Sequence, residues 1–161
     1  MGTGKNLVGR ELAQRTGMQY VNTDDIVEKK AGCAISDIFK DQGEDVFRDL
    51  ERDAVRYAAL LDNYVISTGG GVVKDKGNMD LLQENAVIVC LRADAKTIFQ
   101  RTEKDDARPL LDVEDRLLEI QKLLDTREVF YSRCDFSVDT AGMEPGGIAG
   151  LILDFVSGLR E

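Results

Sequence analysis

The chain has 161 residues, of which 43% are hydrophobic and 32% charged, and this is the size and composition of one globular domain. It contains no histidine, which excludes Ser-His-Asp triads, Cys-His pairs and His-ligated zinc. The formal net charge of −9 argues against binding a nucleic-acid backbone, which needs a dense set of cations. A small phosphorylated ligand held by a few arginines remains compatible with this charge.

No feature of the sequence is typical of export or of a membrane protein. No apolar run approaches the roughly 20 residues that a membrane span needs, and no cationic start precedes an apolar stretch. Cys33, Cys90 and Cys134 are an odd number without metal-ligand spacing, so we expect reduced, half-buried thiols. These features predict a cytoplasmic protein without a membrane or nucleic-acid partner.

In the first part of the chain, the apolar spacing predicts a helix over residues 5–15 and a short strand over 18–21. We expect a short helix over 26–30, and another that follows Ser36 as its N-cap and ends near Gly43. A long helix is predicted from Gly43 onward. Its apolar face consists of Phe47, Leu50, Ala54, Ala58 and Leu61.

The second part continues this alternation of strands and helices. The segment from 103 to 113 is polar and without periodicity, so we interpret it as a loop. The other expected elements are strands over 64–67, 86–91 and 136–138 and helices over 78–83, 94–102 and 115–131, with a last helix from Pro145. Such alternation predicts one α/β domain, in which helices cover both faces of a parallel sheet.

The first helix is preceded by a glycine-rich turn, Gly2-Thr3-Gly4-Lys5-Asn6. It matches the end of G-x-x-x-x-G-K-[ST], a loop whose backbone N–H groups surround phosphates at a helix N-terminus. In that motif the glycines let phosphates approach the backbone, and the lysine adds a mobile charge. The match departs from the motif in two ways. The first glycine would precede Met1 by two residues, and Asn6 stands where serine or threonine is expected.

An α/β domain of this type normally has a buried hydrophobic strand directly before such a loop. The sequence contains no such strand, so we expect the central first strand of the sheet to be missing and the start to lie inside the motif. An upstream in-frame apolar run that ends in glycine would confirm this hypothesis. Taken alone, the short motif is equally compatible with an ordinary helix start.

Two further groups of polar residues are candidates for a binding site, one after a predicted strand and one on a predicted helix. Residues 22–25, Asn-Thr-Asp-Asp, follow the second predicted element, at an edge where parallel sheets bind ligands. They fit a ligand site or a helix cap equally well. Arg48 and Glu51 share one helical face, and by themselves they would be interpreted as a surface ion pair.

Three glycines, Gly69, Gly70 and Gly71, end a predicted strand, and this favours close approach of a ligand to the backbone over a plain turn. Arg108 lies in the pattern-free segment, which suits an arginine carried on a lid. Arg127, late in its predicted helix, fits either a partner of the helix dipole or a carboxylate clamp.

Together these motifs resemble the shikimate kinase family. They occur in the family's order as G-T-G-K, N-T-D-D, G-E-D-V-F-R-D-L-E, S-T-G-G-G-V-V, A-R-P-L-L and the later arginine, from Gly2 to the last helix. The resemblance implies a three-layer P-loop kinase fold in one domain, 1–161, with a shikimate-binding subdomain over about 23–61 and a lid over about 103–114. It also implies transfer of the ATP γ-phosphoryl group to the 3-hydroxyl of shikimate, with Mg²⁺, in chorismate and aromatic amino acid biosynthesis.

The resemblance also implies roles for individual residues. Lys5, Asp24 and Arg108 would be catalytic, with Asp24 as the candidate base. The shikimate site would consist of Asp24, Arg48, Glu51, Gly69, Gly70, Gly71 and Arg127. The ATP site would consist of Gly2, Thr3, Gly4, Lys5, Asn6, Leu7, Arg101, Arg108 and Pro145.

At two positions the chain departs from the family pattern. Asn6 replaces serine or threonine and Asn22 replaces aspartate, at the positions that serve Mg²⁺. Hard cations prefer anionic or hydroxyl oxygens, so a weakened or non-catalytic shikimate-binding protein is an alternative. A gluconate or nucleotide kinase is a further alternative, although the F-R-x-x-E and triple-glycine motifs disfavour it. We expect a monomer.

Overall fold

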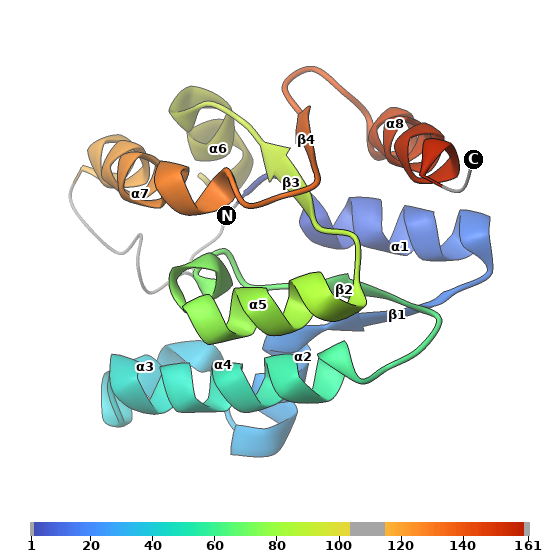
Figure 1. Ribbon diagram of the computed structural model, residues 1–161. Helices are drawn as coiled ribbons and strands as arrows, with labels where there is room; N and C mark the ends of the chain where they lie inside the picture. The colour runs from blue at the N-terminus through green and yellow to red at the C-terminus, as the bar shows by residue number, and fades with distance from the viewer. Residues whose placement is uncertain (1, 104–114, 160–161) are drawn as a thin grey trace.

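The structure, a computed structural model, describes residues 2–103 and 115–159. Short parallel strands lie among helices in the order that the sequence predicts (Figure 1). The strands are β1 (Gln19–Asn22), β2 (Tyr64–Ser67), β3 (Val89–Arg92) and β4 (Phe136–Asp139). The helices are α1 (Lys5–Thr16), α2 (Thr23–Ala31), α3 (Ile35–Asp41), α4 (Glu44–Ala59), the 3₁₀ helix η1 (Val72–Lys74), α5 (Lys76–Asn85), α6 (Ala95–Thr102), α7 (Arg116–Tyr131) and α8 (Pro145–Gly158).

The strands form two parallel pairs, β1 with β2 and β3 with β4. Within the first pair Asn22 lies beside Ser67, so the two strands end at the same level. The second pair ends in the same way, with Arg92 beside Asp139. The carboxyl ends of parallel strands form an edge at which α/β proteins bind ligands.

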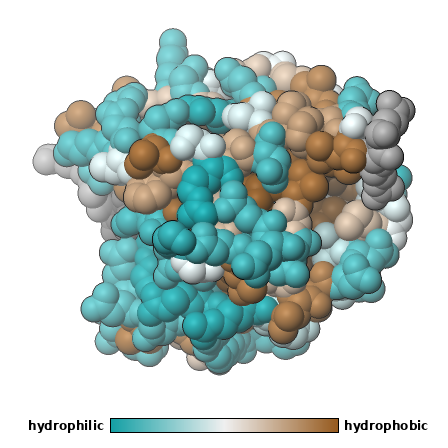
Figure 2. Space-filling view, in the orientation of Figure 1, coloured by the Kyte–Doolittle hydropathy of each residue, from teal (hydrophilic) through white to brown (hydrophobic). Residues whose placement is uncertain are grey.

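Among the described residues, β2 and β3 do not pair, and the sheet is open at its centre. A cavity of about 820 Å³ lies there. In the space-filling view, hydrophobic residues gather around a recess on the side of α1 and α8, whereas the part over α2 to α4 is mainly hydrophilic (Figure 2). Apolar side chains that line the cavity include Val8, Leu12, Val65, Val89, Leu91 and Ile152.

Helices α2, α3 and α4 pack together at one end of the molecule (Figure 1). Their shared core contains Val27 and Ile38, both fully buried, together with Phe47 and Ala54. The last two come from the face of α4 on which the sequence predicts apolar spacing. Within residues 2–103 and 115–159, no helix is long and apolar enough to cross a membrane.

Several predicted boundaries are wrong by a few residues. Helix α3 has Ala34 at its N-cap, so Ser36 lies inside the helix and does not cap it. Helix α2 begins three residues earlier than expected, because Asn22 caps it. Strand β3 begins later than expected, since Ala86 ends α5 by donating its N–H to the carbonyl of Leu82.

The three cysteines are free and half-buried, as the sequence predicts. Burial raises the pKa of Cys90 to about 11, so this thiol stays protonated at neutral pH.

Candidate functional site

The turn before α1 has a conformation that only glycines accommodate without strain. Gly2 and Gly4 have φ angles of 62° and 86°, both in the left-handed region. A Cβ on Gly2 would also come within 2.9 Å of Thr102 Cγ2. No side chain caps α1 at Gly4, so the N–H groups of its first turn, beside Lys5, offer a site for an anion.

Asp24 lies in the first turn of α2, directly after β1. The Asn22 side chain fixes this turn, because its Oδ1 accepts a hydrogen bond from the Asp24 N–H at 3.1 Å. Burial raises the pKa of Asp24, and the positive charge of Lys5 opposes that rise. The phosphate-loop lysine and the predicted base therefore act on one another across the site.

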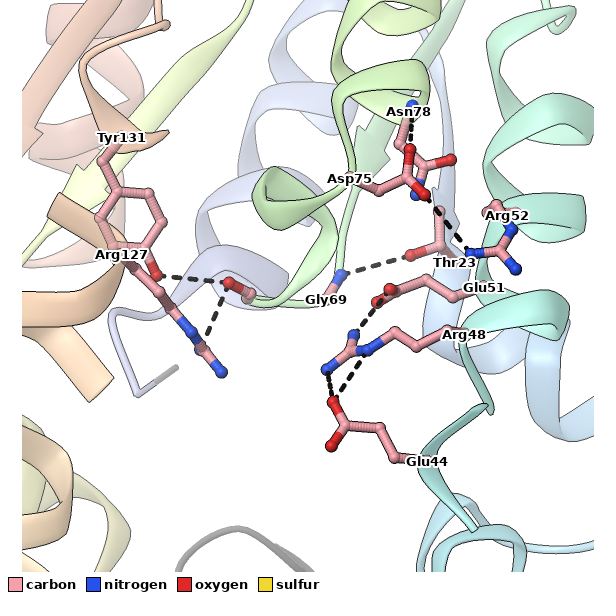
Figure 3. A network of polar contacts seen from close by, with 11 residues as sticks. Thr23, Glu44, Arg48, Glu51, Arg52, Gly69, Asp75, Asn78, Arg127 and Tyr131 are labelled. Atoms are coloured by element: carbon pink, nitrogen blue, oxygen red, sulfur yellow. Dashed lines mark hydrogen bonds and ion pairs between the residues drawn. The ribbon is translucent and has the colours of Figure 1, made fainter. Parts of the chain in front are cut away.

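Arg48 on α4 is held by two carboxylates of its own helix (Figure 3). Its Nη1 donates to Glu51 Oε2 at 2.7 Å, and its Nη2 and Nε donate to Glu44 Oε1 at 2.8 and 3.1 Å. Glu51 is only 2% exposed, so the pair with Arg48 is not the surface ion pair that spacing alone would indicate. Its Oε1 is buried without a hydrogen-bond partner among the described residues.

The free end of the Arg48 guanidinium faces the glycine triplet. A Cβ on Gly71 would lie 2.6 Å from Arg48 Nη1 and 3.1 Å from Nη2, closer than side chains tolerate. Because Glu44 and Glu51 engage three of the five N–H donors, one on Nη1 and one on Nη2 remain for a ligand. Glycine at position 71 therefore allows the guanidinium group of Arg48 to lie against the backbone.

Arg127 reaches the same triplet from α7, on the opposite side (Figure 3). Its Nη1 donates to the Gly70 carbonyl at 3.3 Å, and the Tyr131 hydroxyl donates to the same oxygen at 3.3 Å. Arg127 is 5% exposed, and its hydrogen bond goes to the Gly70 carbonyl and not to the end of its own helix. It is therefore not a partner of the α7 helix dipole. The Gly69 N–H donates to Thr23 Oγ1 at 3.3 Å.

The residues predicted to flank adenine come from α6 and α8. Arg101, in the last turn of α6, donates to the hydroxyl of Thr140 at 2.8 Å and to its carbonyl at 2.7 Å. Thr140 belongs to the connection between β4 and α8, and Pro145 begins α8. Leu7 is largely exposed on α1. Arg108 and nearly all of the predicted lid lie outside the described residues.

The two asparagines predicted at the metal position already bind protein groups. Asn6 Oδ1 accepts a hydrogen bond from Ser67 Oγ at 2.8 Å. Asn22 Oδ1 caps α2, and its Nδ2 donates to Asp25 Oδ1 at 3.2 Å. The described residues contain no group of three or more acidic or cysteine side chains suited to a metal. Uncharged amide oxygens that already accept hydrogen bonds do not fit a protein cage for Mg²⁺.

Two residues that shape the site, Glu44 and Tyr131, were not predicted from the sequence. Each lies four positions from a predicted arginine on the same helix, Glu44 before Arg48 and Tyr131 after Arg127. Side chains at this spacing are neighbours on a helix surface. This spacing is the signal that would have found them.

A glycine turn at a helix N-terminus, a half-buried aspartate after one parallel strand and two arginines at the glycine triplet after the next are the arrangement of an ATP-dependent kinase that acts on a small molecule. The sequence model of the family described as shikimate kinase matches residues 1–157. The chain belongs to the shikimate kinase family.

Curated relatives and solved structures agree with this assignment. Shikimate kinase from Thermodesulfovibrio yellowstonii is 41% identical over 153 residues, which cover 95% of this chain and 88% of the relative. That from Caldanaerobacter subterraneus is 43% identical over 141 residues, covering 88% and 82%. The structure of shikimate kinase from Acinetobacter baumannii in complex with shikimate has a TM-score of 0.96 at 30% identity, covering 99% of this chain and 90% of that one. The structure from Aquifex aeolicus has a TM-score of 0.86 at 28% identity, covering 99% and 94%.

Proposed function

We propose that this chain transfers the γ-phosphoryl group of ATP to the 3-hydroxyl of shikimate, giving shikimate 3-phosphate and ADP on the route to chorismate and the aromatic amino acids. The observation that carries the proposal is the convergence of Arg48 and Arg127 on the glycine triplet beside Asp24. The likeness to a relative whose structure holds shikimate supports it.

In this proposal the two arginines bind the shikimate carboxylate. A guanidinium group offers paired N–H donors that match the two oxygens of a carboxylate. Arg48 presents its free Nη1 and Nη2 donors, while Glu44 and Glu51 keep its plane fixed. Arg127 approaches from α7, so the carboxylate would lie between two cations in a partly dehydrated site.

Asp24 is the proposed general base. The 3-hydroxyl oxygen attacks the γ-phosphorus, its proton passes to the Asp24 carboxylate, and the bond from the γ-phosphorus to the bridging oxygen breaks as ADP leaves. Lys5, whose charge already acts on Asp24, would neutralise charge on the transferred group. The reaction needs positioning and charge neutralisation more than covalent help, which suits a site without histidine.

The first turn of α1, with Gly2 to Leu7, is the proposed phosphate site, and Arg101 and Pro145 are proposed to flank adenine. We propose that Arg108 closes over ATP from the lid. Mg²⁺ held by the phosphates of ATP would neutralise part of their charge. The protein's own contribution there is the backbone N–H groups of α1 and the Lys5 ammonium.

We propose one domain over 1–161, with a shikimate-binding subdomain over about 23–61 and a lid over about 103–114. The separate core that α2, α3 and α4 share supports the first of these two units. A monomer in the cytoplasm is part of the proposal. A size-exclusion elution volume that corresponds to a dimer would contradict the monomer.

The decisive experiment follows ADP release with ATP, Mg²⁺ and shikimate, and identifies the product by phosphorus NMR. We expect shikimate-dependent turnover and a single phosphate ester at the 3-hydroxyl. Gluconate and a nucleoside monophosphate, each in place of shikimate, should give none. Shikimate binding without turnover would instead support a non-catalytic protein, the second candidate that Asn6 and Asn22 favour because both amide oxygens already bind protein groups.

A further inference from the structure

The Gly70 carbonyl is held by side chains of α7 on one side of the glycine triplet. Arg127 Nη1 and the Tyr131 hydroxyl both donate to this oxygen, each at 3.3 Å (Figure 3). A carbonyl oxygen has two lone pairs, so the two donors fill its capacity. The two side chains are neighbours on one face of the helix.

The other groups of the triplet are fixed by the backbone and by one hydroxyl. The Gly69 N–H donates to Thr23, and the Gly69 carbonyl accepts from the Val72 N–H at 3.3 Å. The Gly71 carbonyl accepts from the Lys74 N–H at 3.0 Å. Within the described ranges, the Gly70 carbonyl has only side-chain donors. Since glycine has no Cβ to limit rotation, these donors set the plane of the peptide between Gly70 and Gly71.

That plane decides where the Gly71 N–H points. In a trans peptide the carbonyl and the following N–H point in opposite directions, and the structure contains no cis peptide among the residues it describes. Because the Gly70 carbonyl points to α7, the Gly71 N–H points away from α7, toward the side where Arg48 lies. It has no hydrogen-bond partner among residues 2–103 and 115–159.

We propose that Tyr131 is a positioning residue of the acceptor site: by sharing the Gly70 carbonyl with Arg127, its hydroxyl directs the Gly71 N–H at the bound substrate. This inference rests on the proposed function. Burial raises the pKa of the Tyr131 hydroxyl, which keeps it protonated and able to donate. Without the Tyr131 hydroxyl, Arg127 would have to donate to the Gly70 carbonyl and to the substrate carboxylate at the same time. With Tyr131 present, the peptide keeps its orientation when Arg127 turns toward the ligand.

The test is Tyr131→Phe, which removes one hydroxyl and keeps the ring. We expect the KM and the calorimetric Kd for shikimate to rise about fivefold, the equivalent of about 1 kcal/mol for one hydrogen bond. The values of kcat and of KM for ATP should stay within error, because the hydroxyl does not touch the phosphate loop. Tm should fall by no more than about 2–4 °C, because the same hydrogen bond is present without substrate. Tyr57→Phe is the matched control, since Tyr57 is 57% exposed and its hydroxyl loss should change nothing.

The possible results separate this inference from the proposed function. If the unsubstituted chain fails to bind shikimate, the proposed function is wrong and the inference falls with it. If the unsubstituted chain binds shikimate and Tyr131→Phe binds it equally well, only the inference is wrong. A lower Tm with an unchanged Kd would show that Tyr131 supports the fold alone, and this too would overturn the inference.

Discussion

The carboxyl groups of Asp24 and Glu51 meet at the same glycine, although they come from different helices. A Cβ on Gly69 would lie 2.8 Å from Asp24 Oδ1 and 3.1 Å from Glu51 Oε1. Burial raises the pKa of both groups, and the charge of Asp24 adds to the rise at Glu51. The site therefore contains buried negative charge, which Lys5 offsets at Asp24 and Arg48 offsets at Glu51.

This buried charge predicts the pH dependence of activity. Asp24 must be deprotonated to accept the hydroxyl proton, and its pKa is raised, so activity should be lost at a higher pH than an ordinary aspartate would give. We expect the acidic limb of kcat/KM for shikimate to have its midpoint above 3.8, the usual aspartate pKa. A pH series of initial rates measures it.

The control for the pH profile is Asp24→Asn, which cannot accept the proton. Its kcat should fall by roughly 10²–10⁴. Its residual rate should lack the acidic limb. If the variant keeps the same limb, another group sets it and Asp24 is not the base.

Glu44→Gln tests how strongly the fixed plane of Arg48 matters. The substitution weakens the oxygen that accepts from both Nε and Nη2 of Arg48. The guanidinium group that faces Gly71 then loses its fixed orientation. We expect KM for shikimate to rise about three- to tenfold, with kcat and KM for ATP nearly unchanged. Steady-state kinetics with each substrate varied in turn measure this split.

Glu11→Gln is the matched control, because Glu11 also pairs with an arginine four residues away, on α1. That pair is exposed, and such pairs contribute about 0–1 kcal/mol. Its loss should leave all kinetic constants unchanged. A lower KM in Glu44→Gln would show instead that Glu44 competes with the substrate for Arg48.

Gly71→Ala tests the close approach of Arg48 to the backbone. The new Cβ would overlap Arg48 Nη1, and the flexible arginine would move while the fold stays intact. Displacement of a substrate-binding group by about 1 Å can reduce activity about 100-fold, so we expect KM for shikimate to rise at least about tenfold. Gly158→Ala is the control, because a Cβ there would meet nothing within 4 Å. Equal KM values in the two variants would contradict the proposed position of Arg48.

Much of the fold follows from local patterns in the sequence. The helices and strands alternate as apolar periodicity predicts, and α7 begins within one residue of the expected position. The errors lie at boundaries, where capping decides and periodicity does not. Ser36 has the right side chain for a cap, yet the backbone turns into the helix at Ala34. Such a choice depends on neighbouring packing that a single sequence window does not contain.

The candidate site was only partly predictable, for a related reason. Spacing placed Arg48 and Glu51 on one helical face, but Glu51 is buried beside Gly69, which lies in a distant segment of the chain. The meeting of Arg127 with Gly70 joins residues 57 positions apart. Only the family resemblance indicated that these residues act together, because no local pattern predicts a contact between residues so far apart in the sequence.

Asn22→Asp tests the departure from the family pattern at the metal position. An aspartate can still cap α2 by accepting from the Asp24 N–H, and it adds an anionic oxygen, which Mg²⁺ prefers over an amide. We expect the Mg²⁺ concentration for half-maximal activity to fall. The substitution also replaces the hydrogen bond to Asp25 by repulsion between like charges, so Tm should fall as well. Magnesium titration of the initial rate and thermal unfolding measure the two effects.

Asp25→Asn separates these two effects, because it removes the neighbouring charge while Asn22 stays in place. Its Mg²⁺ requirement should match that of the unsubstituted chain. In the double variant Asn22→Asp with Asp25→Asn the like-charge repulsion is absent, so Tm should recover while the lower Mg²⁺ requirement persists. If the magnesium titration is unchanged in both the single and the double variant that carry Asn22→Asp, the phosphates alone hold the metal and position 22 does not contribute.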